Sequence, residues 1–183
     1  MTESQRDVAV IIGKLVLVCL VASLMLGLTY VPTQEQLEIN KIEAQEEALK
    51  EVVPSASEFE PVYNSGEQIL YYRAFDSSGN LVGYAFFSEE NGYNGPVELA
   101  GGIDASFNTI TGMEVMGHSE TPGLGAKITE DKFKNQFSDL TVGDLQLSQN
   151  GGSIDAITGA TTSSHAVVDA LNSKIDEIKE HET

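Results

Sequence analysis

The sequence contains little cysteine and few basic residues. Cys19 is the only cysteine among 183 residues, so the chain can form neither an internal disulfide nor a cysteine-based zinc site. Ten lysines and arginines stand against 28 aspartates and glutamates, which gives a net charge of −18. No segment has the row of basic side chains that binding to a phosphate backbone requires. These shortages argue against a disulfide-stapled fold and against nucleic acid as a partner.

Common catalytic signatures are absent too. The sequence contains no G-x-x-x-x-G-K-[ST], G-x-G-x-x-G, H-E-x-x-H or G-x-S-x-G motif. His118, His165 and His181 form no pair at the i, i+4 spacing of helical metal ligands. We expect His165 on the surface of a helix and His181 in a frayed tail, whereas His118 precedes a glycine-rich loop and could line a site. The sequence therefore predicts no catalytic residue and no metal site.

One long apolar run is present near the start of the chain. Residues 8–31 contain a single charge, Lys14, and as a helix they span about 36 Å, more than the hydrocarbon core of about 30 Å. A cleaved signal peptide is the alternative, but no small-x-small cleavage site follows the run. A lipid-modified cysteine is disfavoured because the bulky Val18 precedes Cys19. We predict a single-pass membrane helix at 8–31.

Charges around this helix give a weak indication of its orientation. Arg6 and Lys14 lie on its N-terminal side, whereas Lys41 and Lys50 lie further out among many acids. Because lysine and arginine favour the cytoplasmic side, residues 1–7 are expected in the cytoplasm. The soluble domain would then lie on the outer side of the cytoplasmic (inner) membrane.

Residues 32–60 are predicted to form a helical stalk or linker. Thr33–Gln36 has the pattern of a capping box, and the helical spacing that follows ends at Pro54. We expect a helix or helical stalk that continues from the membrane segment. The remaining residues, 61–183, carry six bases and 18 acids and have the length of one domain.

Strand pairs followed by helices predict an α+β fold for residues 61–183. A short helix with Thr129 as its N-cap and a long C-terminal helix beginning near Thr161 are expected to flank the strands. The expected strands are 69–76, 81–88, 97–103, 109–117 and a short one at 145–148.

Two glycine-rich segments, 117–125 and 155–164, are candidates for a binding site. The second runs into the start of a helix, where free backbone N–H groups and the helix dipole favour an anion. Gly159 and Ala160 lack bulk, so a large group could approach the backbone there. The alternative is a turn followed by an ordinary Ser/Thr cap.

The residues of these segments also resemble a known family. Asp155–Thr161 (DAITGAT) resembles the flavinylation motif D-x-x-[ST]-G-A-T, whose last threonine carries FMN through a phosphoester. Glu120–Gly125 (ETPGLG) is similar to the companion loop of the same FMN-binding domain. With Gly92–Pro96 (GYNGP) and one membrane helix, the whole chain resembles the RnfG family. Its members are the G subunits of Rnf ion-translocating, ferredoxin-linked oxidoreductase complexes.

The resemblance implies an electron-carrier flavoprotein subunit with no stand-alone catalysis. FMN would be covalently attached to Thr161, with Thr162 as the rival acceptor by position, and the FMN domain would lie outside the cytoplasm. An ApbE-like flavin transferase, which would read the surface around Asp155, and the other Rnf subunits are the implied partners. The further residues carried over as cofactor-binding are Thr158, Gly159, Ala160, Thr121, Leu124, Gly125 and, less firmly, Glu120.

Two related interpretations stay open. The NqrC subunit of the sodium-pumping NADH:quinone oxidoreductase has the same motifs on a longer chain. A membrane-tethered module that binds FMN without a covalent bond would also fit the two glycine-rich segments.

Overall fold

The computed structural model describes residues 3–182, which divide into two compact units, one ending at Glu43 and one beginning at Ala44. The first unit is formed by the helix α1 (Glu3–Val52) as far as Glu43. Its segment Val10–Gly27 has a mean hydropathy of 2.5, and none of it is buried. Within residues 3–182, α1 is the one helix long and apolar enough to cross a membrane. This segment lies inside the predicted span 8–31.

Helix α1 continues without a break past Pro32. The interpretation of Thr33–Gln36 as a capping box is therefore wrong, whereas the predicted helix that continues from the apolar segment is confirmed. A proline inside a helix removes one backbone hydrogen bond. The capping-box pattern indicates a local preference for a helix start, but these residues lie inside a continuous helix.

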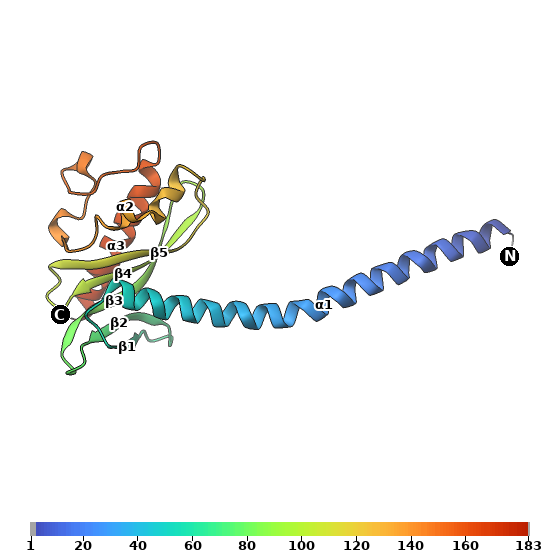
Figure 1. The fold of residues 1–183 in the computed structure, drawn as a ribbon, viewed down its shortest axis with the longest axis horizontal. Helices are drawn as coiled ribbons and strands as arrows, with labels where there is room; N and C mark the ends of the chain where they lie inside the picture. The colour runs from blue at the N-terminus through green and yellow to red at the C-terminus, as the bar shows by residue number, and fades with distance from the viewer. Residues whose placement is uncertain (1–2, 183) are drawn as a thin grey trace. The chain divides into compact units, whose positions relative to one another are not determined.

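The second unit is built on a six-stranded antiparallel sheet in which each strand pairs with its neighbours in sequence order. This meander, with helices beside it, confirms the predicted α+β fold (Figure 1). The strands are β1 (Glu58–Tyr63), β2 (Ile69–Phe75), β3 (Leu81–Asn91), β4 (Pro96–Asp104), β5 (Thr109–His118) and β6 (Leu140–Thr141).

One face of the sheet carries the large apolar side chains and is covered by α3 (Thr161–Glu182). Phe86 and Leu99 are buried there, and they pack in the same cluster as Leu171 and Ile175 of α3. The spacing of the apolar residues along α3 places them on one stripe, which is why a helix of this sequence docks on a sheet. This cluster is the main core of the unit.

The other face of the sheet carries small residues and receives the last turns of α1. Leu49 and Val52 pack there against Ala85 and Ala100. A Cβ added to Gly102 would lie 2.2 Å from the carbonyl oxygen of Val52, so this glycine is required for the close approach. The interval predicted as a stalk, 32–60, thus contributes side chains to this core and also contains the start of β1.

Short helical turns connect the strands to α3. They are η1 (Gly125–Thr129), α2 (Asp131–Lys134), η2 (Val142–Asp144) and η3 (Ser148–Asn150). The predicted N-cap at Thr129 is wrong, because its hydroxyl donates back to the Ala126 carbonyl at 2.9 Å and α2 begins at Asp131. The strand predicted at 145–148 is also wrong: only Leu147 forms an isolated bridge.

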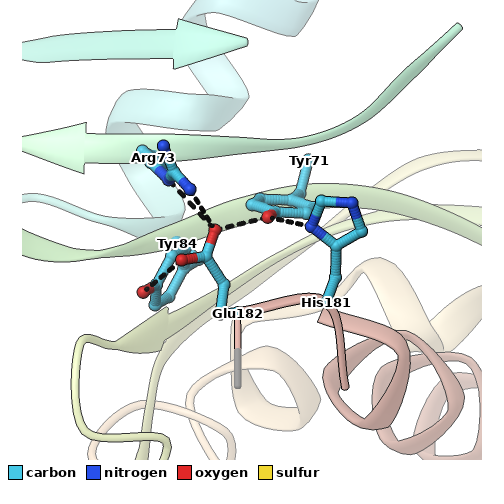
Figure 2. Close-up of polar contacts among 5 residues, drawn as sticks. All are labelled: Tyr71, Arg73, Tyr84, His181 and Glu182. Atoms are coloured by element: carbon cyan, nitrogen blue, oxygen red, sulfur yellow. Dashed lines mark hydrogen bonds and ion pairs between the residues drawn. The ribbon is translucent and has the colours of Figure 1, made fainter. Parts of the chain in front are cut away.

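The last turn of α3 is tied to the sheet by a cluster of polar side chains (Figure 2). Glu182 accepts hydrogen bonds from Tyr71 and, at 3.0 Å, from the Arg73 Nε, while the Tyr84 hydroxyl lies 3.4 Å from its second oxygen. Nδ1 of His181 lies 2.9 Å from the Tyr71 hydroxyl. The prediction that His181 lies in a frayed tail is therefore wrong, although its side chain is exposed.

Candidate functional site

Three segments that are far apart in the sequence meet beside the first turn of α3. They are the turn 92–95 between β3 and β4, the glycine-rich stretch 119–125 after β5, and residues 160–164. All three contain residues that the sequence analysis singled out. The structure therefore brings the predicted motifs to one place.

The side chain of Glu120 lies at the point where the three segments meet. It is 5% exposed. One carboxylate oxygen accepts hydrogen bonds from the backbone N–H groups of Tyr93 at 2.7 Å and Asn94 at 3.1 Å. The other oxygen accepts the Ser163 hydroxyl at 2.7 Å. The protein itself thus uses both oxygens, and a direct contact of Glu120 with a flavin stays a prediction.

Electrostatics at this point favour the ionised carboxylate. Burial raises the pKa of Glu120, but the hydrogen bonds from Ser163, Asn94 and Tyr93, together with the neighbouring His118, outweigh burial and hold the pKa below its ordinary value. The backbone N–H of Glu120 also donates to Nδ1 of His118 at 3.1 Å. Glu120 therefore carries a negative charge at neutral pH.

Two glycines make room for the buried carboxylate. A Cβ on Gly92 would lie 2.2 Å from one Glu120 oxygen, and a Cβ on Gly125 would lie 2.4 Å from the other and 2.6 Å from the Ser163 hydroxyl oxygen. Neither position can hold a larger residue unless Glu120 moves. Gly125 is buried, so its main visible role is packing, and its predicted contact with a flavin stays a prediction.

The four hydroxyl-bearing residues at the start of α3 differ sharply in their surroundings. Ser163 and Ser164 are buried: Ser163 bonds Glu120, and Ser164 donates to the Ala160 carbonyl and accepts the N–H of Ile157. Thr161 and Thr162 are exposed. Only the two threonines therefore present a hydroxyl to a partner.

Apolar side chains are exposed beside these threonines. Gly159 has φ +80°, a conformation that L side chains rarely adopt, and a Cβ there would lie 3.4 Å from the side chain of Leu124. Leu124 is 46% exposed, and Tyr93 on the neighbouring turn is 74% exposed. The turn is fixed to the loop by a hydrogen bond from the Asn94 amide to the Thr121 hydroxyl at 2.8 Å. An apolar surface thus stands next to the helix start.

Gln136 holds the first residue of the 155–161 segment. Its side-chain oxygen accepts the backbone N–H of Asp155 at 2.7 Å, and its amide donates to the Asp155 carbonyl at 3.4 Å. The Asp155 side chain is left exposed, as is Thr158. These exposed positions are open to a partner protein.

A cavity of about 680 Å³ opens between the η1–α2 segment and the 155–158 segment. Its lining includes Lys127, Lys132, Asp155 and Thr158. Among the residues that the structure describes, neither Lys127 nor Lys132 has an ion-pair partner within 4.0 Å. Glu130 lines the same cavity, so the charged part of the lining combines two exposed lysines with two carboxylates.

Sequence reasoning missed the residues that connect the motifs. The link from Glu120 to Ser163 and the clamp of Gln136 on Asp155 join positions 43 and 19 residues apart. Neither pair has a sequence signal of its own. Within the described part of the chain, no group of three or more His, Cys, Asp or Glu residues is arranged to hold a metal ion.

Comparisons with known proteins relate this geometry to a family. A family model described as FMN-binding domain matches residues 92–176, which include all three segments. The G subunit of the ion-translocating oxidoreductase complex of Methanosarcina acetivorans is 48% identical over 98% of this chain and 99% of that protein. The chain belongs to the family of G subunits of ion-translocating oxidoreductase complexes. The resemblance to the RnfG family is thereby confirmed.

More distant members of this family differ in the ion that their names give. The protein of Acetobacterium woodii, named for a Na⁺-translocating ferredoxin:NAD⁺ oxidoreductase complex, is 32% identical over 85% of this chain and 84% of its own length. That of Clostridium ljungdahlii, named for a proton-translocating complex, is 26% identical over 96% and 94%.

A solved structure supports the fold alone. NqrC of Shewanella oneidensis is 18% identical, with a TM-score of 0.50 over 71% of this chain and 74% of that one.

Proposed function

We propose that this chain is an electron-carrier flavoprotein subunit of an Rnf-type ion-translocating oxidoreductase, with FMN joined by a phosphoester to Thr161. The observation that carries the proposal is the exposed Thr161 hydroxyl at the first residue of α3, within a D-x-x-T-G-A-T segment. The two serines that follow are buried and engaged, which leaves Thr162 as the rival acceptor. The motif favours Thr161.

The residues present fit a phosphate at this position. The first N–H groups of a helix have no carbonyl within the helix to bind, and a 22-residue helix such as α3 adds its dipole. A phosphodiester keeps one negative charge, which the free N–H groups and the dipole at the start of α3 stabilise.

The surroundings also fit an isoalloxazine ring. Leu124 and Tyr93 supply exposed apolar surface, and Gly159 allows close approach to the backbone. The ring supplies the redox chemistry, while the protein supplies position and electrostatics. A covalent link prevents dissociation, which suits a carrier that is repeatedly reduced and oxidised. Thr121, Leu124, Gly125, Thr158, Gly159 and Ala160 are the proposed contacts.

The apolar part of α1 and the relatives named as ion-translocating subunits support a membrane-anchored protein. We infer that the domain from Ala44 onward lies on the extracytoplasmic side, with residues 1–7 in the cytoplasm. The neighbouring redox subunits of the complex would give electrons to the flavin and take them from it. An ApbE-like flavin transferase would recognise the exposed Asp155 and Thr158. The protein acts as one part of a translocase and not as an enzyme by itself.

Thr161→Ala tests the attachment, with Thr162→Ala as the matched control. Both variants are produced in a host that has a flavin transferase. After denaturing electrophoresis, wild type and Thr162→Ala should give a fluorescent band under ultraviolet light, and Thr161→Ala should give none. Intact mass should show one added FMN less water in the fluorescent samples. A bright Thr161→Ala band rejects this acceptor.

Non-covalent FMN binding is the competing function, because the same cavity and apolar surface could hold a free flavin. Wild-type protein that is yellow but loses all colour on denaturation and filtration would favour it. An NqrC-like role would leave the attachment unchanged and would differ in the complex that co-purifies with the chain.

A further inference from the structure

Glu120 is the only charged residue in the buried class among the residues that the structure describes. A buried carboxylate is costly unless it is fully hydrogen-bonded. Here three donors from two other segments reach it, at 2.7, 3.1 and 2.7 Å. The site therefore contains a charge whose protein partners come from outside its own loop.

The partners of Glu120 lie 26, 27 and 43 residues away in the sequence. Two backbone N–H groups from the 92–95 turn and one hydroxyl from α3 converge on its two oxygens. Ser163 is two residues from Thr161, so the same carboxylate fixes the loop with Leu124, the turn with Tyr93 and the helix with the acceptor. The backbone at Gly92 and at Gly125 lies close to this carboxylate, since a Cβ at either position would overlap its oxygens.

An ionised carboxylate suits these donors better than any neutral side chain. All three partners donate, and a carboxylate accepts at both oxygens, whereas a protonated one must use one oxygen as a donor. Protonation of Glu120 would remove the charge assistance from the bonds that Tyr93 and Asn94 donate, and it would reverse or break the bond with the Ser163 hydroxyl. The strength of the bonds from Glu120 to the other two segments therefore depends on its charge state, while the Asn94–Thr121 bond joins the turn to the loop independently.

We propose that ionised Glu120 is the positioning residue of the flavin site, which holds the 92–95 turn and the 121–125 loop against the first turn of α3. The role as a flavin site rests on the function proposed above, whereas the connection itself does not. Glu120 acts through the residues that it holds and needs no contact with the flavin.

The connection is tested first in flavin-free protein, using Thr161→Ala as the background in the full-length chain. Amide hydrogen exchange of Tyr93 and Asn94 is measured with and without Glu120→Ala. Loss of the carboxylate should speed exchange of these two amides at least about tenfold while the central strands β3 and β4 are unaffected. Glu89→Ala, an exposed carboxylate on β3, is the matched control and should change nothing.

A pH series separates positioning by charge from mere packing. In the background protein, protection of the Tyr93 and Asn94 amides should fall as the pH drops through the lowered pKa of Glu120. Glu120→Gln, which cannot titrate, should abolish this step and keep part of the protection. His118 is the titratable neighbour that acts on the carboxylate, so the step that Glu120→Gln abolishes is the one assigned to Glu120.

The consequence for the site is tested in the flavin-bearing chain. Glu120→Ala should lower the flavinylated fraction severalfold or raise flavin mobility in fluorescence anisotropy, and Glu120→Gln should partly restore both. Equal amide exchange in Glu120→Ala and its parent, with no acid step, would overturn the positioning role. An unmodified wild-type protein would instead overturn only the covalent function, because the flavin-free result stands by itself.

Discussion

At the scale of single residues, Glu182 shows how one carboxylate fixes the end of a helix. Burial raises its pKa, but hydrogen bonds from Tyr71 and Arg73 outweigh burial and hold that pKa below its ordinary value. Its side chain is 15% exposed, whereas the paired Arg73 is 40% exposed. The bond to Tyr71 therefore matters more than the ion pair, since exposed charge is screened by water.

Glu182→Ala should lower the free energy of unfolding by about 1–2 kcal/mol, because it removes a charged hydrogen-bond acceptor from the buried Tyr71. Ionised Glu182 contributes this stability in full above the ordinary glutamate pKa of about 4.3. The contribution is lost as the pH falls through the lowered pKa that Glu182 has in the folded protein. Urea unfolding between pH 3 and 7 measures it. Glu182→Gln should flatten this dependence, and the exposed Glu180→Ala should behave like wild type.

The residues of the two motifs could be predicted from the sequence because their types and spacing are characteristic. Their partners could not be. Ser163 looks like one of four equivalent cap residues, and only the fold shows that it is bonded to Glu120. Likewise, nothing in the C-terminal sequence indicates that His181 and Glu182 reach Tyr71 on β2.

At the scale of elements, the contact of α1 with the sheet depends on small residues. Gly102 and Gly112 lie under the last turn of α1, and the Thr111 hydroxyl donates to the Val52 carbonyl. The helix approaches this face where the sheet residues are glycine or alanine. The geometry explains why the two faces of one sheet carry such different residues.

Gly102→Ala should therefore destabilise the domain by about 1–3 kcal/mol or more through overpacking. The added Cβ would lie 2.2 Å from a backbone oxygen that cannot rotate away. Thermal unfolding measures the effect. Gly143→Ala, where nothing lies within 4 Å, is the matched control and should leave the melting temperature nearly unchanged.

Alternating patterns made β2, β3, β4 and β5 predictable, and the periodic C-terminal stretch did the same for α3. The edge strand β1 was missed because it is only half buried and contains Pro61, which an edge position tolerates. Residues 145–148 look like a strand because Leu145 and Leu147 alternate, yet both are buried in a compact loop. Burial in a loop and burial in a strand leave the same short signature.

At the scale of the whole molecule, the compact unit starts at Ala44 and not where the strand-like sequence starts. Leu49, Val52 and Val53 fill the second core, and β1 pairs with β2. Each such side chain contributes about 1.5–3 kcal/mol on burial, against a typical total stability of about 5–15 kcal/mol. The second unit thus needs the end of α1.

A fragment 44–183 should fold as a soluble, cooperative domain, and a fragment 61–183 should not. Circular dichroism with thermal melting distinguishes them: the longer fragment should give one sharp transition, and the shorter should melt about 10–15 °C lower or lack a transition. Equal melting of the two fragments would contradict the role assigned to the end of α1.

The order of the strands has a consequence for synthesis. Because each strand pairs with the one before it, the sheet can assemble progressively as the chain leaves the ribosome. Its large apolar face stays uncovered until α3, the final element, has been made. Thr161, the acceptor that we propose, is the first residue of that helix and reaches its final surroundings only in a complete domain. A modifying enzyme that recognises the assembled surface would therefore pass over incomplete chains.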